Sequence, residues 1–210
     1  MRRILQRLRR ASSPAAREHP VPPLAHGVVL LATGISIRNG LQADALTSDT
    51  GEPLLRQLAR GALATGPDAL VVSVPADDHT ALEVVLRGLP LRCIPVPRGM
   101  AQGAALRAAL SVLPDSCSGA LLLPCDRVRT AAADLARLLE AWRLQPQRAA
   151  CFAADRGIPG LPALLPQPWW EDLDPDNGLA LRTLLQARCG EVSVLEEDAL
   201  GRPPPDHAVA

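Results

Sequence analysis

The sequence predicts an α/β fold in which a mostly parallel central sheet carries helices on both faces. Short apolar runs without alternation recur along the chain, as expected of strands that are covered on both faces. Segments with leucine and alanine at helical spacing lie between these runs. Strands and helices therefore alternate along the chain, as they do in βαβ units.

Length and composition limit the organisation and the partners. The 210 residues suffice for one domain with a full core. We expect this domain over residues 25–200, after a basic, Pro-rich and disordered leader at 1–24 and before a Pro-rich tail at 201–210. A short amphipathic helix on an acidic surface is the alternative for the leader.

The charge balance and the cysteines add to this picture. The 22 basic and 22 acidic side chains cancel, so nothing indicates a nucleic-acid partner. No apolar run is long enough to span a membrane. The five cysteines have no C-x-x-C spacing, which favours reduced cysteines in a cytoplasmic protein.

The predicted elements follow one another in regular order. Strands are expected from Val28 and at residues 69–74, 91–96 and 120–123, the third of them Pro-bounded and nearer an edge. Helices are expected from Pro53 to Gly66, from about residue 78 to 86 with Gly88 closing it, at 104–113, and after an N-cap at Thr130.

The first strand leads directly into a glycine-containing loop. Gly34 and Gly40 allow tight turns with open N–H groups, while Ser36 and Arg38 add a hydroxyl and a guanidinium. This combination suits an anion such as a phosphate. On spacing alone, a plain structural turn is the alternative.

Asp126 follows the fourth strand. Ligands of open α/β sheets bind beyond the carboxyl ends of the strands. A carboxylate at this place can hold Mg²⁺ between phosphates. An aspartate that caps the next turn is the alternative.

A third candidate precedes the helix at 104–113. Gly99 and Gly103 lie just before this helix and would leave its first N–H groups open to an anion or a ribose. A flexible connection between strand and helix is the alternative.

In this order, the motifs resemble those of the MobA-like nucleotidyltransferases, which attach a nucleotide to the molybdenum cofactor. The first loop matches the family's Leu-Ala-Gly-Gly-x-Ser-x-Arg-Met-Gly pattern at Leu31, Ala32, Gly34, Ser36, Arg38 and Gly40. Asp126 matches the family's metal ligand, and residues 99–106 look like the base-reading loop of the cofactor cytidylyltransferases. Residues 160–164 and 176–178 resemble segments that line the cofactor side of the cleft.

The resemblance implies a three-layer, Rossmann-like nucleotidyltransferase fold of the GT-A type. It also implies a Mg²⁺-dependent reaction in which the terminal phosphate of molybdopterin attacks the α-phosphate of CTP or GTP and pyrophosphate leaves. A molybdoenzyme or a chaperone is then a candidate protein partner.

The resemblance assigns roles to individual residues. Arg38 and Asp126 would act in catalysis, with Asp126 on the metal. The nucleotide would be bound by Leu31, Ala32, Thr33, Gly34, Ser36, Arg38, Gly99 and Gly103. The acceptor would face Pro162, Trp169, Asp176 and Gly178. Trp169 and its neighbour Trp170 would stack on a pterin, and packing under a lid is the alternative for them.

Two further functions stay open, one because the chain departs from the family pattern and one because the nucleotide half of the site also resembles enzymes that act on sugar phosphates or phosphorylated acids. Ala43 stands where the family has a lysine, the chain contains no lysine at all, Val128 replaces a proline, and Asp198 is a weak stand-in for a C-terminal acidic motif. One alternative is a catalytically silent domain that binds a nucleotide or a pterin as an accessory or scaffold protein. The other is nucleotidyl transfer to a sugar phosphate or a phosphorylated acid.

Overall fold

The structure, a computed structural model, describes residues 24–32, 51–125, 132–153 and 159–196. Its strands are β1 (His26–Leu31), β2 (Ala69–Pro75), β3 (Arg92–Val96), β4 (Gly119–Pro124), β5 (Ala149–Ala153), β6 (Pro159–Pro166) and β7 (Val192–Leu195). Its helices are α2 (Leu54–Leu63), α3 (His79–Leu86), α4 (Gln102–Leu110), α5 (Ala132–Leu144) and α6 (Ala180–Ala187). Short 3-10 helices are η2 (Ala76–Asp78), η4 (Gln167–Asp172) and η5 (Cys189–Glu191).

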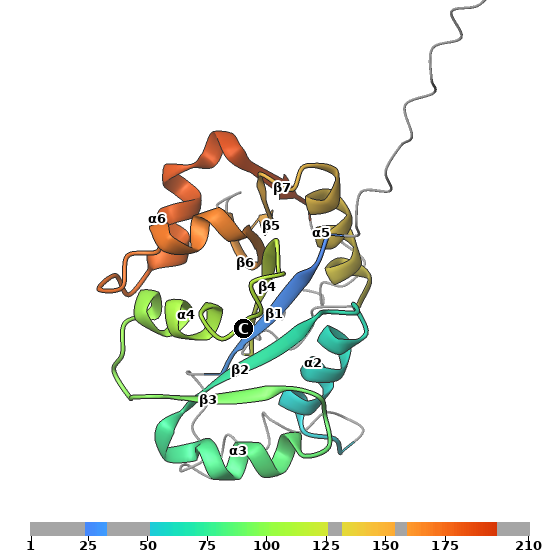
Figure 1. Ribbon diagram of the computed structural model, residues 1–210, viewed down its shortest axis with the longest axis vertical. Helices are drawn as coiled ribbons and strands as arrows, with labels where there is room; N and C mark the ends of the chain where they lie inside the picture. Colours follow the sequence, from blue (N-terminus) through green and yellow to red (C-terminus); the bar gives the residue numbers. More distant parts are fainter. Residues whose placement is uncertain (1–23, 33–50, 126–131, 154–158, 197–210) are drawn as a thin grey trace, which may run out of the picture.

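The seven strands form one twisted sheet in the order β3-β2-β1-β4-β6-β5-β7 (Figure 1). β1 is parallel to β2 and β4, and β2 is parallel to β3. β6 runs antiparallel to both of its neighbours, β4 and β5, while β7 is parallel to β5. The sheet is therefore mostly parallel, and β3 forms one edge of it as predicted.

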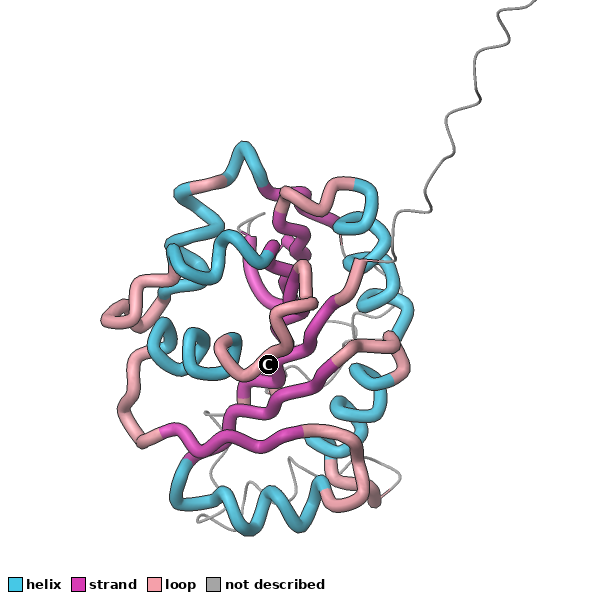
Figure 2. Tube along the Cα trace, in the orientation of Figure 1, coloured by secondary structure: helices cyan, strands magenta, loops and turns pink. Residues whose placement is uncertain are grey.

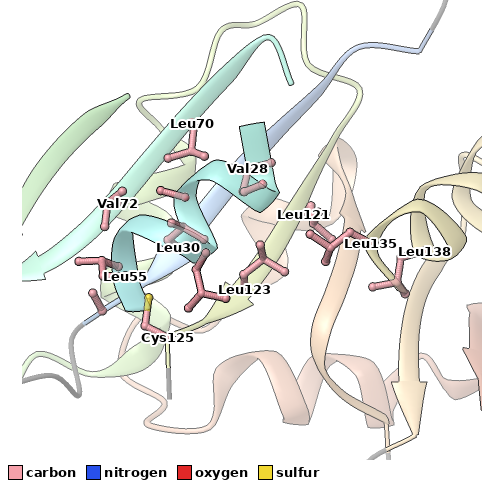
Figure 3. Packing of buried hydrophobic residues seen from close by; sticks show 14 of the residues in the cluster. Val28, Leu30, Leu55, Leu70, Val72, Leu121, Leu123, Cys125, Leu135 and Leu138 are labelled. Atoms are coloured by element: carbon pink, nitrogen blue, oxygen red, sulfur yellow. The ribbon is translucent and has the colours of Figure 1, made fainter. Parts of the chain in front are cut away.

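Two apolar clusters cover the two faces of the sheet. Alternate residues of β1 divide between them, because successive side chains of a strand point to opposite faces. Val28 and Leu30 pack with α2, α3 and α5, and part of this cluster is shown in Figure 3. Val29 packs with α4, η4 and α6 on the other face. Figure 2 shows the strands between the two sets of helices, which confirms the three-layer α/β prediction.

The first four strands and their helices match the sequence closely. Pro53 sits just before α2, and its carbonyl accepts the N–H groups of Arg56 and Gln57. Gly88 follows α3 with φ at +83°, the left-handed conformation that ends many helices. α4 begins two residues earlier than predicted and ends three residues earlier. The predicted cap Thr130 lies outside the described residues.

The strands β5, β6 and β7 and the helix α6 were not predicted. β6 has prolines at positions 159, 162 and 166, a composition that argues against a strand inside a sheet. The structure places Pro159 and Pro166 at its two ends. Pro162 lies where the register with β5 shifts between the Cys151 and Ala153 pairings, so the ladder is already interrupted there.

Candidate functional site

The carboxyl ends of β1, β2 and β4 meet at one edge of the sheet. The N–H of Cys125 donates to the carbonyl of Leu31 over 3.1 Å, and the N–H of Ala32 donates to the carbonyl of Ser73 over 2.9 Å. The chain therefore leaves β1 and β4 at adjacent points. The two predicted phosphate and metal segments continue from these points in sequence.

Most of the predicted phosphate-side residues lie outside the described residues. These are Thr33, Gly34, Ser36, Arg38 and Asp126, together with the departures Ala43, Val128 and Asp198. Of the described ones, Ala32 is fully buried in one core cluster and Leu31 packs against the other. Their side chains thus anchor the start of the loop in the core.

An ion-pair network that sequence reasoning missed joins the ends of β2 and β3. The guanidinium of Arg98 donates to Asp77 Oδ2 over 2.6 Å and to Asp78 Oδ2 over 3.2 Å. The hydrogen bond to Asp77 raises the pKa of Arg98. Asp78 is only 5 % exposed, so its charge needs this partner. The signal in the sequence was two carboxylates after one strand and an arginine after the next.

Gly99 directly follows this arginine. Its φ of +79° lies in the left-handed region, and the turn around it is closed by a hydrogen bond from Met100 N–H to the Pro97 carbonyl. Apart from its two chain neighbours, no described residue has an atom within 4 Å of the place where a Cβ would stand. Gly99 therefore serves the backbone turn and leaves open space beside it.

The first N–H groups of α4 are not open, which corrects the prediction for Gly103. The N–H of Gly103 donates to the Asn177 carbonyl and that of Ala104 to the Pro175 carbonyl, both over 3.1 Å. The prediction that the Gly103 N–H is open to a ligand is therefore wrong. The helix start is instead docked on the segment that leads into α6.

This docking brings together two predicted parts of the site that are far apart in sequence. Asp176 and Gly178 are exposed on the segment that α4 contacts. The N–H of Asp176 is held by the Asp174 carboxylate over 3.0 Å, and the N–H of Leu179 by the Asn177 side chain over 2.7 Å. The predicted base-reading loop and the predicted acceptor segment are thus neighbours.

Trp169 does not face a ligand, which corrects the stacking prediction. It is 3 % exposed within one core cluster, and the Arg188 guanidinium lies over its ring at 4.7 Å from the centroid. Trp170 is half-buried, and its Nε1 donates to the Leu165 carbonyl over 3.4 Å. Trp169 therefore takes the packing alternative, because a core position offers no face to a pterin, whereas stacking by Trp170 stays a prediction.

Pro162 lies near the edge at which β4 ends. β6 is antiparallel to β4, and its Ala163 pairs with Leu122. The start of β6 therefore reaches the carboxyl end of β4. Pro162 itself is buried there.

Within the described ranges, no three His, Cys, Asp or Glu side chains gather to hold a metal ion. No helix of the described residues is long and apolar enough to cross a membrane. A Mg²⁺ ion bound between phosphates needs only one or two carboxylates from the protein. The predicted ligand Asp126 follows Cys125 directly in sequence and lies outside the described residues.

Solved structures share this fold. Rv0371c from Mycobacterium tuberculosis H37Rv, in a complex with manganese, is 19 % identical with a TM-score of 0.69 over 87 % of this chain and 95 % of its own. A nucleotidyl transferase from Methanothermobacter is 18 % identical with a TM-score of 0.65, covering 83 % of this chain and 88 % of its own. The 4-diphosphocytidyl-2C-methyl-D-erythritol synthase of Anaerococcus prevotii is 11 % identical with a TM-score of 0.64, covering 88 % and 92 %.

Sequence comparison assigns the family. No curated protein matches the chain. The family model of the MobA-like NTP transferase domain matches residues 28–194, which include every strand that we describe except the first two residues of β1 and the last residue of β7. This chain belongs to the MobA-like NTP transferase domain family and is a nucleotidyltransferase.

Proposed function

We propose that the protein joins CTP or GTP to the terminal phosphate of molybdopterin, or of the molybdenum cofactor, and releases pyrophosphate. The observation that carries the proposal is the hydrogen bond between Cys125 and Leu31. It holds the ends of β1 and β4 together, so the glycine loop after β1 and Asp126 after β4 start from the same edge. A phosphate loop and a metal carboxylate must converge in this way on one triphosphate.

Mg²⁺ is the proposed metal, with Asp126 as its ligand. A divalent ion supplies charge neutralisation at the phosphates. The structure of Rv0371c with manganese supports a divalent ion in this fold. One carboxylate from the protein suffices for this role, because phosphates and water complete the shell of Mg²⁺.

The chain's own residues would mainly bind and orient the nucleotide and the acceptor. The backbone of Gly34 and the hydroxyl of Ser36 would cradle the triphosphate, and the Arg38 guanidinium would face its charge. Open space beside the turn at Gly99 and the exposure of Asp176 and Gly178 support the proposed nucleotide and acceptor contacts at these residues. Alignment and charge account for most of such a reaction, since little covalent chemistry is asked of the protein.

A titration with CTP and with GTP, each with and without Mg²⁺, tests the nucleotide half of the proposal. We expect binding that depends on Mg²⁺ and prefers one of the two nucleotides. A pyrophosphate-release assay with molybdopterin as acceptor then tests the acceptor. Absence of binding by either nucleotide would contradict the assignment of the loop that follows β1.

Ala43 supports a catalytically silent domain as the alternative. The family's lysine would bring a second positive charge to the triphosphate, and the chain contains no other lysine. One electrostatic donor of this kind contributes about 3 kcal/mol to the transition state. Nucleotide binding without pyrophosphate release would favour this alternative, and a gain of release in Ala43→Lys would explain it.

Transfer to a sugar phosphate or a phosphorylated acid is the other alternative. It is supported by the likeness of the fold to a 4-diphosphocytidyl-2C-methyl-D-erythritol synthase. Pyrophosphate release with such an acceptor, and none with molybdopterin, would establish it. The nucleotide half of the site would be unchanged in that case.

A further inference from the structure

Gly103 is the point of closest approach between α4 and the segment that leads into α6. A Cβ at Gly103 would stand 1.7 Å from the carbonyl oxygen of Asp174 and 3.0 Å from the Cβ of Ala180. Contacts below 3.0 Å to backbone atoms cannot be relieved by a side-chain rotation. Only glycine therefore fits between the helix and this segment.

Three further contacts hold the same two parts together. The guanidinium of Arg107, one turn along α4, donates to the carbonyls of Glu171 and Leu173, both over 3.4 Å. The side chain of Gln102 accepts the N–H of Leu181 at the start of α6 over 3.4 Å. With the N–H groups of Gly103 and Ala104, these bonds tie α4 to residues 171–181 at several points.

The loop before α4 is also fixed at its other end. Arg98 is held by the carboxylates of Asp77 and Asp78 at the end of β2. The stretch from Arg98 to Gln102, the first residue of α4, therefore runs between two anchors, one on η2 directly after β2 and one on the acceptor-side segment. Movement of that segment would be passed to the loop.

We propose that Gly103 is a positioning residue that joins the nucleotide-side loop 98–102 and the acceptor-side segment 174–178 into one unit. This proposal rests on the proposed function for the roles of the two parts. It gives Gly103 a different role from the ligand contact predicted from the sequence. Binding of a nucleotide on one side then stabilises the acceptor side, and the effect is reciprocal.

Hydrogen–deuterium exchange of the whole protein is the direct test, with and without Mg²⁺ and the nucleotide that it binds. In the wild-type protein we expect the nucleotide to slow exchange at the amides of Asp176 and Leu179 by about tenfold. In Gly103→Ala we expect faster exchange at residues 103 and 104 without nucleotide, and no protection of Asp176 and Leu179 on binding.

Gly61→Ala is the matched control. Gly61 lies in α2, and beyond its own helix backbone none of the described residues comes within 4 Å of its Cβ position, so the added methyl group is accommodated. We expect wild-type exchange and wild-type nucleotide affinity in this variant. If Gly103→Ala does not fold, Arg107→Ala removes two of the ties and should reduce the protection about threefold, whereas Arg107→Lys should retain part of it.

The outcomes distinguish a failure of the proposed coupling from a failure of the proposed function. Nucleotide binding that leaves Asp176 and Leu179 unprotected in the wild-type protein overturns the coupling. A Gly103→Ala variant that is less stable but keeps the protection of Asp176 and Leu179 on nucleotide binding also overturns the coupling, because Gly103 would then have a structural role only. If the wild-type protein binds no nucleotide, the proposed function fails, and unchanged exchange at 103 and 104 in Gly103→Ala would overturn the docking as well.

Discussion

His26 is a buried imidazole at the start of β1, opposite the edge that carries the candidate site. It is 1 % exposed, and its Nε2 lies 3.2 Å from the hydroxyl of Thr65. Burial lowers the pKa of His26, the charge of Arg143 lowers it further, and Asp68 opposes the shift. The folded protein therefore holds this imidazole neutral at pH values where the unfolded chain protonates it.

This pKa predicts a loss of stability in mild acid. Below the unfolded pKa of about 6.5, the unfolded state binds more protons at His26 than the folded state does. The free energy of unfolding should therefore fall as the pH is lowered from 7.5 through 6.5 toward the lowered folded pKa. When the free energy of unfolding is measured in urea across this pH range, it should depend less steeply on pH in His26→Gln than in the wild-type protein. Equal slopes in the wild-type protein and His26→Gln would contradict the account.

The cysteines differ sharply in their expected reactivity. Burial, with the charge of Glu83, raises the pKa of Cys93 to about 11, while Cys117, Cys125 and Cys151 are buried. Cys189 alone among the five is exposed. Because the thiolate is the reactive form, we expect a disulfide reagent at pH 7.5 to label about one thiol rapidly per folded chain. Cys189→Ser should abolish the rapid phase, and its persistence would show that another thiol is accessible.

The predictions for the two tryptophans and for Gly103 show which tertiary contacts a single sequence does not reveal. A pair of tryptophans indicates a large apolar surface, but whether it faces the core or a ligand depends on α6 and Arg188, which come later in the chain. Gly103 was noticed as a glycine at a helix start. Its actual constraint is the Asp174 carbonyl, a contact between residues about seventy positions apart that no local pattern contains.

The end of α3 is held by a side chain from α2. The guanidinium of Arg56 donates to the carbonyls of Val85 and Arg87, each over 2.9 Å. The last carbonyls of a helix lack partners within the helix, so this arginine satisfies two of them. The contact also ties α2 to α3 on one face of the sheet.

Arg56→Ala should therefore lower the free energy of unfolding by about 1.5 to 3 kcal/mol, the range for hydrogen bonds that involve a charged group. Arg56→Lys keeps the charge but lacks the planar fork, so it should recover only part of the loss. Chemical denaturation of the three proteins measures both effects. An unchanged free energy of unfolding in Arg56→Ala would mean that hydrogen bonds to solvent replace these two bonds without loss of stability.

The helices and strands that could be predicted are those whose sequence signals lie within a few residues of one another. β1 to β4 and α2 to α5 could be predicted because apolar runs, Pro53 and Gly88 mark them within a few residues. β6 could not, because its prolines contradict a strand locally and are tolerated only at its ends and at the register shift beside β5. β7 is four residues long and carries too short a pattern to identify.

The position of the candidate site in the whole molecule follows from where the parallel strands end. The candidate site was predicted from motifs after β1, β3 and β4, and the sheet order places β1 between β2 and β4, so these motifs start from one edge. The family match and the fold establish a nucleotidyltransferase domain. The acceptor side stays a prediction that rests on the resemblance alone, whereas the docking of residues 174–178 on α4 is a tertiary contact that no local pattern contains.

Pyrophosphate release from CTP or GTP, with molybdopterin as acceptor, tests the central claim most directly when the wild-type protein is compared with Asp126→Asn. The substitution removes the carboxylate charge proposed for Mg²⁺ and nearly preserves the volume of the side chain. We predict Mg²⁺-dependent release by the wild-type protein and a loss of about 10²-fold or more in kcat for Asp126→Asn, the scale of one lost electrostatic contact. Equal rates for the two proteins, or release that does not depend on a divalent ion, would contradict the account.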